Sequence, residues 1–256
     1  MSIEVANKMM ALKDVIDDVH ESGIEKGYSN GERYMWDAIT NRNSKNRLTT
    51  YMFYEYPYEE FNPPYAIICK NYTAKSMFAS AYKLKKIKKG TLDFGGKGCY
   101  SGSRTSTSSG LTMLFHNCTS LEEIEDIGLN EGSHYYTFGM CEKLRKIEKL
   151  CPRYDTIFTN AFTNCYALEE ITFDGEIGRD INFLSCKKLN ADSVKSIVTH
   201  LKDYTSESAN QYKYTLTLND ETFNALEQAD TTAEYNGEAC TWAELVDNKK
   251  WNLVLY

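Results

Sequence analysis

The sequence predicts an α+β fold in which a short solenoid of stacked repeats carries a parallel β ladder. Three observations support this prediction. A phrase of ten residues, Phe-x-x-Cys-x-x-Leu-x-x-Ile, recurs through the middle of the chain. Its copies start 37, 23, 24 and 21 residues apart, a spacing typical of solenoids, in which each unit buries its apolar face against its neighbours. The residues on either side follow other patterns, which indicate an N-terminal helical segment and an α/β C-terminal cap.

These patterns divide the 256 residues into four parts, and a chain of this length can bury a sizeable core. We expect an N-terminal helical and oligomerisation segment at 1–47 and an aromatic N-terminal cap at 48–76. The solenoid, with about five repeats, is expected at 77–190, and the C-terminal α/β cap at 191–256.

The repeat phrase supplies the predicted core. Phe and Cys three positions apart should share one side of a helical turn, and Leu-x-x-Ile should begin an extended segment that lies beside its counterparts. Cys is small and often buried, so it suits a position where turns stack closely. Ala81 occupies the Cys position of the first copy and Asp192 the Ile position of the last. The predicted repeat-core residues are Phe78, Leu84, Ile87, Phe115, Cys118, Leu121, Ile124, Phe138, Cys141, Leu144, Ile147, Phe162, Cys165, Leu168, Ile171, Phe183, Cys186 and Leu189.

Charges alternate in sign at the two exposed positions between Leu and Ile. Parallel strands lie roughly 4.8 Å apart, so each charge should lie beside opposite charges, and each exposed pair contributes about 0.2–1 kcal/mol. We therefore expect this face to be electrostatically self-satisfied, and ligands to meet the loops at the repeat ends. The two columns are Lys85, Glu122, Arg145 and Glu169, and Lys86, Glu123, Lys146 and Glu170.

Composition and charge argue against several classes of function. A formal net charge of −7 and a pI near 5.3 disfavour nucleic acid as the main partner. The eight cysteines include no Cys-x-x-Cys pair, so we expect free thiols, no structural metal and no cofactor. No secretory signal and no apolar stretch of membrane-spanning length are recognisable, so we expect no membrane insertion.

Residues 1–40 are predicted to be helical. Apolar residues recur at steps of four and three, as in the seam of a coiled coil, and acidic residues keep the other side polar. The seam covers fewer than three heptads, so this helix needs a partner. That partner is another copy of the chain, which we favour, a larger assembly, or the chain's own solenoid. The predicted oligomerisation residues are Val5, Met9, Leu12, Ile16 and Val19.

Two unusual segments flank the first repeat. Aromatic residues crowd 48–68, where three prolines prevent a long helix. We interpret them as a cap over the first repeat, with a sugar-stacking surface as the alternative. A Gly- and Ser-rich stretch at 95–110 accounts for the long first step and is predicted to be an exposed, flexible loop. It lacks the glycine pattern of a phosphate cradle.

The C-terminal cap is predicted from helix and strand signals after the last repeat. Asn190 can cap a helix that extends to His200. The later signals are a strand at 214–218, a helix opened by Asn219, a short helix with a capping box from Thr241 to Glu244, and a strand at 251–256.

No catalytic set is recognisable. The four histidines lie in different predicted elements. His116 is two residues from Cys118, a spacing that suggests a Cys–His nucleophile, but Cys118 fills a repeat position that Cys141 and Cys165 also fill. We therefore predict no catalytic, cofactor-binding or metal-binding residues, and a protein that is not an enzyme.

The repeat phrase, clearest at 161–171, resembles the BspA-like class of bacterial leucine-rich repeats. The segments 24–31, 36–39, 61–67 and 241–253 look like leucine-rich-repeat proteins encoded in Firmicutes prophages. Together the resemblance covers most of the chain. It implies a leucine-rich-repeat solenoid and a virion- or tail-associated binding protein, and it implies no catalytic residues.

Three functional hypotheses follow. The first is a non-catalytic phage tail or virion protein, made in the bacterial cytoplasm without a signal peptide, whose loops bind a host-surface glycan or protein or another tail protein. Its N-terminal helix would join copies of the chain. The second is a bacterial cell-surface adhesin of the same repeat class, which would need an export signal or anchor. The third is an enzyme acting on cell-wall glycans.

Overall fold

In this computed structural model the chain is described at residues 50–63, 66–70, 73–100, 102–207 and 212–256. Within them the fold is α+β, as predicted, with few helices and several parallel sheets. The strands are β1 (Ile67–Ile68), β2 (Lys86–Ile87), β3 (Leu92–Asp93), β4 (Glu123–Ile124), β5 (Lys146–Leu150), β6 (Glu170–Phe173), β7 (Ile181–Asn182), β8 (Tyr214–Leu218), β9 (Ala233–Tyr235), β10 (Glu238–Cys240) and β11 (Trp251–Leu255). The helices are α3 (Ala191–Thr199), α4 (Asp220–Ala229) and α5 (Trp242–Asn248).

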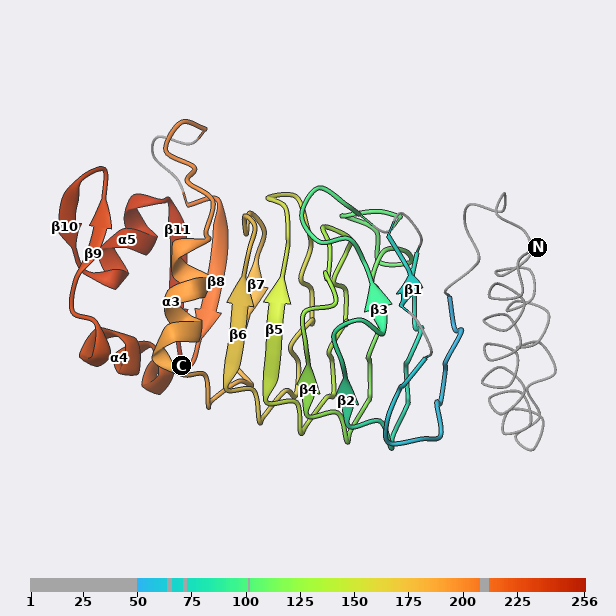
Figure 1. The fold of residues 1–256 in the computed structure, drawn as a ribbon. Coiled ribbons are helices and arrows are strands. Elements are labelled where there is room, and N and C mark those ends of the chain that lie inside the picture. The colour runs from blue at the N-terminus through green and yellow to red at the C-terminus, as the bar shows by residue number, and fades with distance from the viewer. Residues whose placement is uncertain (1–49, 64–65, 71–72, 101, 208–211) are drawn as a thin grey trace.

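The largest sheet has the strand order β2-β4-β5-β6, and neighbouring strands are parallel (Figure 1). Its register aligns Lys86 with Glu123, Glu123 with Lys146, and Lys146 with Glu170. The isoleucines that follow these residues are aligned in the same way and are buried. Charged and apolar side chains thus alternate across the sheet, because successive side chains of a strand point to opposite faces.

Ion pairs join the charges of neighbouring strands. Lys86 Nζ lies 2.8 Å from a carboxylate oxygen of Glu123, and Lys146 Nζ lies 3.2 Å from the acidic side chain of β6. In the other predicted column, Lys85 pairs with Glu59 at 2.7 Å. Such partly exposed pairs contribute little to stability. The alternating sign of the charges along the column instead favours one order of the repeat units, because opposite charges then lie side by side.

The repeat phenylalanines stack in one continuous column inside the repeat region. Ring centroids lie 5.6, 6.2, 5.6 and 4.5 Å apart along Phe78, Phe115, Phe138, Phe162 and Phe183. The rings are almost entirely buried. Large aromatic side chains dominate core energetics, so this column is the main source of contact between units.

The phenylalanines of the first four copies lie in runs of turns, and the prediction of a helical turn is wrong. Met113 and Asn117, which flank Phe115, have φ angles of 54° and 62°. Their amides bond to carbonyl groups of the next unit, each at 2.8 Å. Non-glycine residues rarely adopt such angles, so hydrogen bonds between units offset the strain. The left-handed pairs are Tyr51 and Glu55, Ser76 and Ser80, Met113 and Asn117, Tyr136 and Met140, and Asn160 and Asn164.

The repeat cysteines add a second contact between units. Each thiol donates a hydrogen bond to the carbonyl of the repeat phenylalanine in the preceding unit, as Cys141 Sγ does to Phe115 O at 3.0 Å. The corresponding distances for Cys118, Cys165 and Cys186 are 3.0, 3.1 and 3.8 Å. Burial raises the pKa of the Cys118 and Cys165 thiols, which keeps them protonated and able to donate. The position therefore accommodates a small side chain, Ala81 in the first copy, and the four cysteines add a hydrogen bond between units.

The stack extends one unit beyond the first repeat toward the N-terminus. Phe53 stacks on Phe78 with ring centroids 5.0 Å apart, and its amide bonds to the backbone of that repeat at 2.8 Å. Phe53 and Phe61 are buried, whereas Tyr51 and Tyr58 are 51% and 44% exposed. The aromatic segment thus covers the first repeat and also presents tyrosine rings to solvent.

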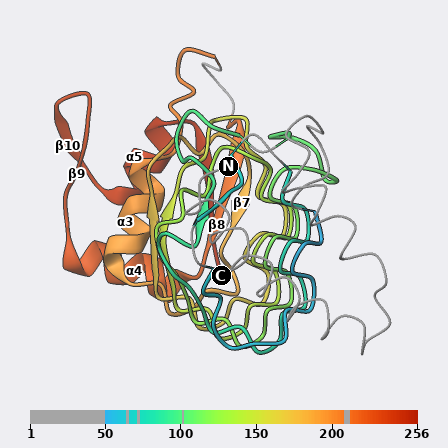
Figure 2. The ribbon, with the colours of Figure 1, turned by 45° about the vertical axis from the view of Figure 1, so that its right-hand side comes forward.

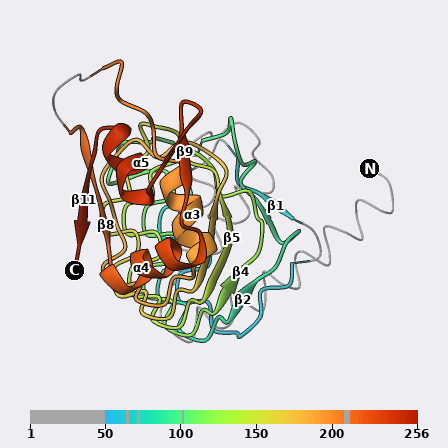
Figure 3. The ribbon, with the colours of Figure 1, turned by 90° about the vertical axis from the view of Figure 1, so that its left-hand side faces the viewer.

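The other end of the stack is closed by α3, α4, α5 and the parallel sheet β11-β8-β7 (Figure 3). Asn190 caps α3, Asn219 caps α4, and Thr241 forms a capping box with Glu244 at the start of α5. These helix starts, and strands β8 and β11, are confirmed predictions. The antiparallel β9–β10 hairpin was not predicted; it projects from this end (Figure 2).

Two serines of α3 satisfy the open edge of the repeat sheet. Ser193 Oγ accepts a hydrogen bond from Ile171 N at 3.0 Å, and Ser196 Oγ accepts one from Phe173 N at 2.9 Å. Both amides belong to β6, the last strand of that sheet. An unpaired edge is a template for aggregation, so α3 ends the sheet both chemically and sterically.

Replacing Cys141 with alanine should lower the free energy of unfolding by about 1–2 kcal/mol, because Phe115 O loses one of its two donors and a small cavity forms. Cys240, partly exposed in β10, is the matched control. Cys240→Ala should change the stability by less than about 0.5 kcal/mol. Urea unfolding followed by circular dichroism measures both. Equal effects of the two substitutions would contradict the role given to the thiol hydrogen bonds.

Candidate functional site

The predicted repeat-core residues lie inside the stack. None of them is more than 3% exposed. They form the scaffold and leave binding to other residues. The predicted oligomerisation residues Val5, Met9, Leu12, Ile16 and Val19 lie outside the residues that the structure describes.

His116 and Cys118 do not form a catalytic pair. The Cys118 thiol donates to Phe78 O inside the core, and the half-buried His116 ring meets the edge of Tyr136, with ring centroids 5.5 Å apart. Among the described residues, no group of three or more His, Cys, Asp or Glu side chains could hold a metal ion. The described helices are also too short or too polar for any of them to cross a membrane.

A groove of about 490 Å³ lies between the stack and the C-terminal cap. It is bordered by the Gly- and Ser-rich loop at 95–110, which we call the inserted loop, by the turns that follow β5 and β6, and by the C-terminal end of α3. We call it the polar groove. Its volume is within the range of about 300–1,000 Å³ that is usual for ligand pockets. The polar side chains that line it include Lys97, Glu131, Arg153, Asp174, Glu176 and His200.

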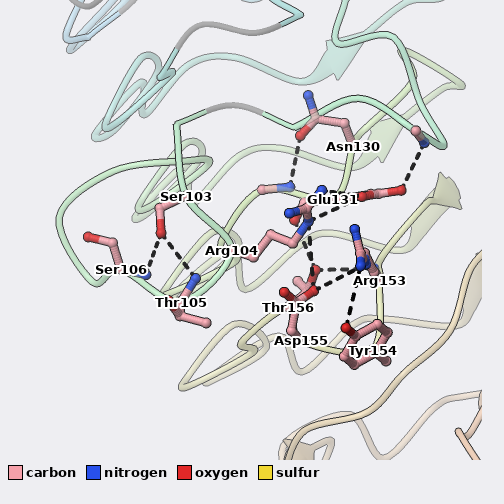
Figure 4. Close-up of polar contacts among 12 residues, drawn as sticks. Ser103, Arg104, Thr105, Ser106, Asn130, Glu131, Arg153, Tyr154, Asp155 and Thr156 are labelled. Atoms are coloured by element: carbon pink, nitrogen blue, oxygen red, sulfur yellow. Dashed lines mark hydrogen bonds and ion pairs between the residues drawn. The ribbon is translucent and has the colours of Figure 1, made fainter.

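An ion pair fixes the inserted loop to the stack (Figure 4). Arg104 donates to Glu131 Oε2 from Nη2 at 2.7 Å and from Nε at 3.1 Å. Gly98 N, in the same loop, donates to Glu131 Oε1 at 2.9 Å. The Arg104 and Glu131 side chains are only 18% and 9% exposed. The predicted flexible loop is thus exposed over much of its length but clamped at Gly98 and Arg104.

Asp155 lies between two guanidinium groups at the edge of the groove (Figure 4). Its Oδ1 is 3.7 Å from Arg104 Nε and 3.7 Å from Arg153 Nε. This oxygen is buried and has no hydrogen-bond partner among the described residues. The Arg153 and Lys202 cations lie 5.0 and 4.4 Å from the centre of the Tyr154 ring. These contacts hold the arginine and tyrosine in place.

Two glycines let the turns around the groove approach closely. A Cβ atom on Gly175 would lie 2.0 Å from Pro152 O, and one on Gly178 would lie 2.2 Å from Tyr154 O. No side chain fits at either distance. The two turns therefore pack backbone against backbone, which makes the floor of the groove rigid.

His134 is a fully buried histidine next to the clamp. Its ring stacks on Phe138 and Phe158, with centroids 6.2 and 5.2 Å away, and its Nε2 lies 3.2 Å from Asn130 O. Burial lowers the pKa of His134 to about 4. The ring is therefore neutral at pH 7, with Nε2 as the donor to Asn130 O. Its Nδ1 has no partner among the described residues.

The groove was not predicted, although two signals for part of it were present. One is the first repeat step of 37 residues, which marks an insertion. The other is Arg104, an isolated charge within a run of Gly, Ser and Thr. The partners of that loop lie far away along the chain, and single-sequence patterns do not reveal such contacts. The sequence expectation that ligands meet the repeat ends did, however, point to this type of location.

Comparison with protein-family models, with curated proteins and with solved structures found no match for this chain. No relative therefore assigns a ligand to the polar groove. The arguments for its function come from its geometry and from the resemblance carried by the repeat phrase and flanks.

Replacing Arg104 with methionine should lower the free energy of unfolding by about 3 kcal/mol, because Glu131 would remain buried without its cation. Hydrogen exchange should also accelerate at Ser133 and Ile157, whose amides bond to loop carbonyls at 2.6 and 3.0 Å. Arg145→Met, at an exposed ladder position, is the control and should cost at most about 1 kcal/mol. Unchanged exchange in the Arg104 variant would mean that the ion pair does not hold the loop.

His134 should make stability depend on pH. The unfolded chain protonates this residue near pH 6.5 and the folded chain only near pH 4, so stability falls as the pH drops through that interval. His134→Phe keeps the ring stacking and removes this proton uptake. The stability advantage of the wild type over His134→Phe should therefore shrink by about 3 kcal/mol between pH 7 and pH 4. Urea unfolding at both pH values measures it, and a constant difference would refute the assignment.

Proposed function

We propose that the chain is a BspA-like leucine-rich-repeat protein whose units form a solenoid. Three features support this proposal. The ten-residue phrase recurs at a solenoid spacing, the repeat strands align in parallel register, and the Phe rings stack from unit to unit. The aromatic segment covers one end of the stack and α3 covers the other. The terminal units of a solenoid need such caps, because they would otherwise expose their apolar faces.

The activity that we propose is non-catalytic recognition, with the polar groove as the binding site. The observation that carries this proposal is the clamped loop: the inserted segment is fixed to a rigid scaffold by the Arg104–Glu131 pair. Binding sites need side chains that are held in place by their surroundings. By contrast, the ladder charges pair across adjacent strands in one column, Lys86 with Glu123 and Lys146 with Glu170. The repeat thiols donate hydrogen bonds to Phe carbonyls.

In this proposal the chain is a phage tail or virion component that recognises a host-surface glycan or protein, or another tail protein. The resemblance of the flanking segments to Firmicutes prophage proteins favours this setting. A bacterial cell-surface adhesin of the same repeat class is the alternative. An enzyme that acts on cell-wall glycans is the third candidate, and turnover of cell-wall polysaccharide by the purified chain would support it.

Mass spectrometry of purified phage particles tests the virion assignment. Peptides of this chain should co-purify with tail proteins at a constant ratio across the particle fractions. Washed producer cells, digested at their surface with trypsin, are the control. Peptides released from these cells but missing from particles would replace the virion role with the adhesin role.

We also propose that the chain associates with itself through Val5, Met9, Leu12, Ile16 and Val19. A coiled-coil seam of this length gains stability only with a partner. Light scattering should show an oligomer for the full chain and a monomer after deletion of residues 1–31. A chain that stays monomeric at high micromolar concentration would refute self-association while leaving the recognition site untouched.

A further inference from the structure

Opposite charges balance around the polar groove. Lys97 and Arg153 provide cations, while Asp174 and Glu176 provide anions. Arg153 also lies 3.7 Å from Asp155, and Asp174 lies 3.9 Å from Lys149, so each of these two charges is partly offset by a neighbour. Glu131 is already neutralised by Arg104. A ligand with a strong net charge would be attracted by one pair and repelled by the other. The groove thus discriminates against highly charged ligands in general, because like-charge contacts are costly.

Both kinds of hydrogen-bonding group remain unused in the groove. Among the described residues, no hydrogen bond or ion pair engages the Lys97 ammonium, Arg153 Nη1, His200 Nε2 or the Glu176 carboxylate. The ammonium and guanidinium groups only donate, and the carboxylate only accepts. A hydroxyl group does both, so a ligand with several hydroxyl groups can meet all of these positions at once.

The non-polar surface of the groove is at least as extensive as its polar surface. It comes mainly from Pro152, the partly exposed ring of Tyr154 and the largely buried Leu201. The cations of Arg153 and Lys202 lie over the ring of Tyr154. Peptides are usually anchored by large apolar or aromatic side chains that enter pockets. In this groove the non-polar atoms lie among the charged side chains of Lys97, Arg153 and Glu176, and a hydroxyl-rich ligand can contact both kinds of group. We therefore favour a hydroxyl-rich ligand over a peptide.

We propose that the polar groove binds an uncharged saccharide, held by hydrogen bonds to Lys97, Arg153 and Glu176. This inference deepens the proposed function, since it rests on the chain being a recognition protein, and it names the class of ligand. The clamp between Arg104 and Glu131 positions the loop that carries Lys97. The close packing at Gly175 positions the turn that carries Glu176.

An array of neutral, anionic and cationic oligosaccharides tests the proposal with the full-length chain. The trisaccharides of N-acetylglucosamine and glucosamine form a matched neutral and cationic pair, and the trisaccharide of galacturonic acid represents the anionic class. Uncharged members should account for the binding signal. For any that binds, affinity by titration calorimetry should exceed that of its charged counterpart by about tenfold, a difference of about 1.4 kcal/mol. Absence of binding by every uncharged member, or preference for a charged one or for a peptide, overturns the proposal.

A double variant, Lys97→Met with Glu176→Gln, tests whether the saccharide binds in the polar groove. It removes one donor group and one charged acceptor but leaves the net charge unchanged. Affinity for the bound saccharide should fall by about tenfold or more, since the hydrogen bond to Lys97 is lost and the one to Glu176 no longer involves a charged group. Lys187→Met with Glu142→Gln, at exposed positions of the repeat turns, is the matched control and should bind as the wild type does. Thermal unfolding confirms that both variants are folded.

The outcomes separate this inference from the proposed function. If the chain is found in phage particles but binds no saccharide, the virion role is kept and the groove assignment is overturned. Saccharide binding that the double variant does not weaken would also overturn it, because the sugar would then bind elsewhere. Saccharide binding through the groove by a chain that is absent from particles would keep the groove and overturn the virion role.

Discussion

The contact between one repeat and the next, through a phenylalanine ring and a cysteine thiol, is the interaction on which the structure depends. The ring stacks on its counterpart, and the following unit's thiol donates to the carbonyl of the same phenylalanine. Because each unit relies on its neighbours, interior contacts propagate along the chain without a conventional central core. The parallel register of β2, β4, β5 and β6 and the closure of the sheet by α3 both follow from this contact.

This arrangement divides the polar groups into two sets with different roles. In one ladder column, Lys86 pairs with Glu123 and Lys146 with Glu170, and the left-handed turns donate hydrogen bonds from their amides to the next unit. The groups around the inserted loop differ, because one ion pair is buried while several neighbouring groups keep unused hydrogen-bonding capacity. The scaffold is self-sufficient, and the groove is where the described surface combines rigidity with available donors and acceptors.

The sequence predicts those parts of the fold that depend on contacts between equivalent positions. The buried Phe, Cys, Leu and Ile positions and the charge column from Lys86 to Glu170 were accessible in this way. The helix caps at Asn190, Asn219 and Thr241 were accessible from local capping residues. The prediction of a helical turn was wrong because residue spacing alone does not distinguish a helix from turns that form hydrogen bonds to a neighbouring unit. The groove was missed because Arg104 and Glu131 meet through a contact that neither repetition nor local propensity encodes.

The inserted loop also has a consequence for how such a chain can change over generations. The step from Phe78 to Phe115 is much longer than the later steps, yet β2 and β4 pair in the same register as β4 and β5. Loop closure becomes only slowly more costly with length. The turn at that edge is thus a site where segments can be lengthened, shortened or exchanged while the architecture stays intact. A new binding specificity would then require changes in the inserted loop alone, and the stacked repeats would be inherited unaltered.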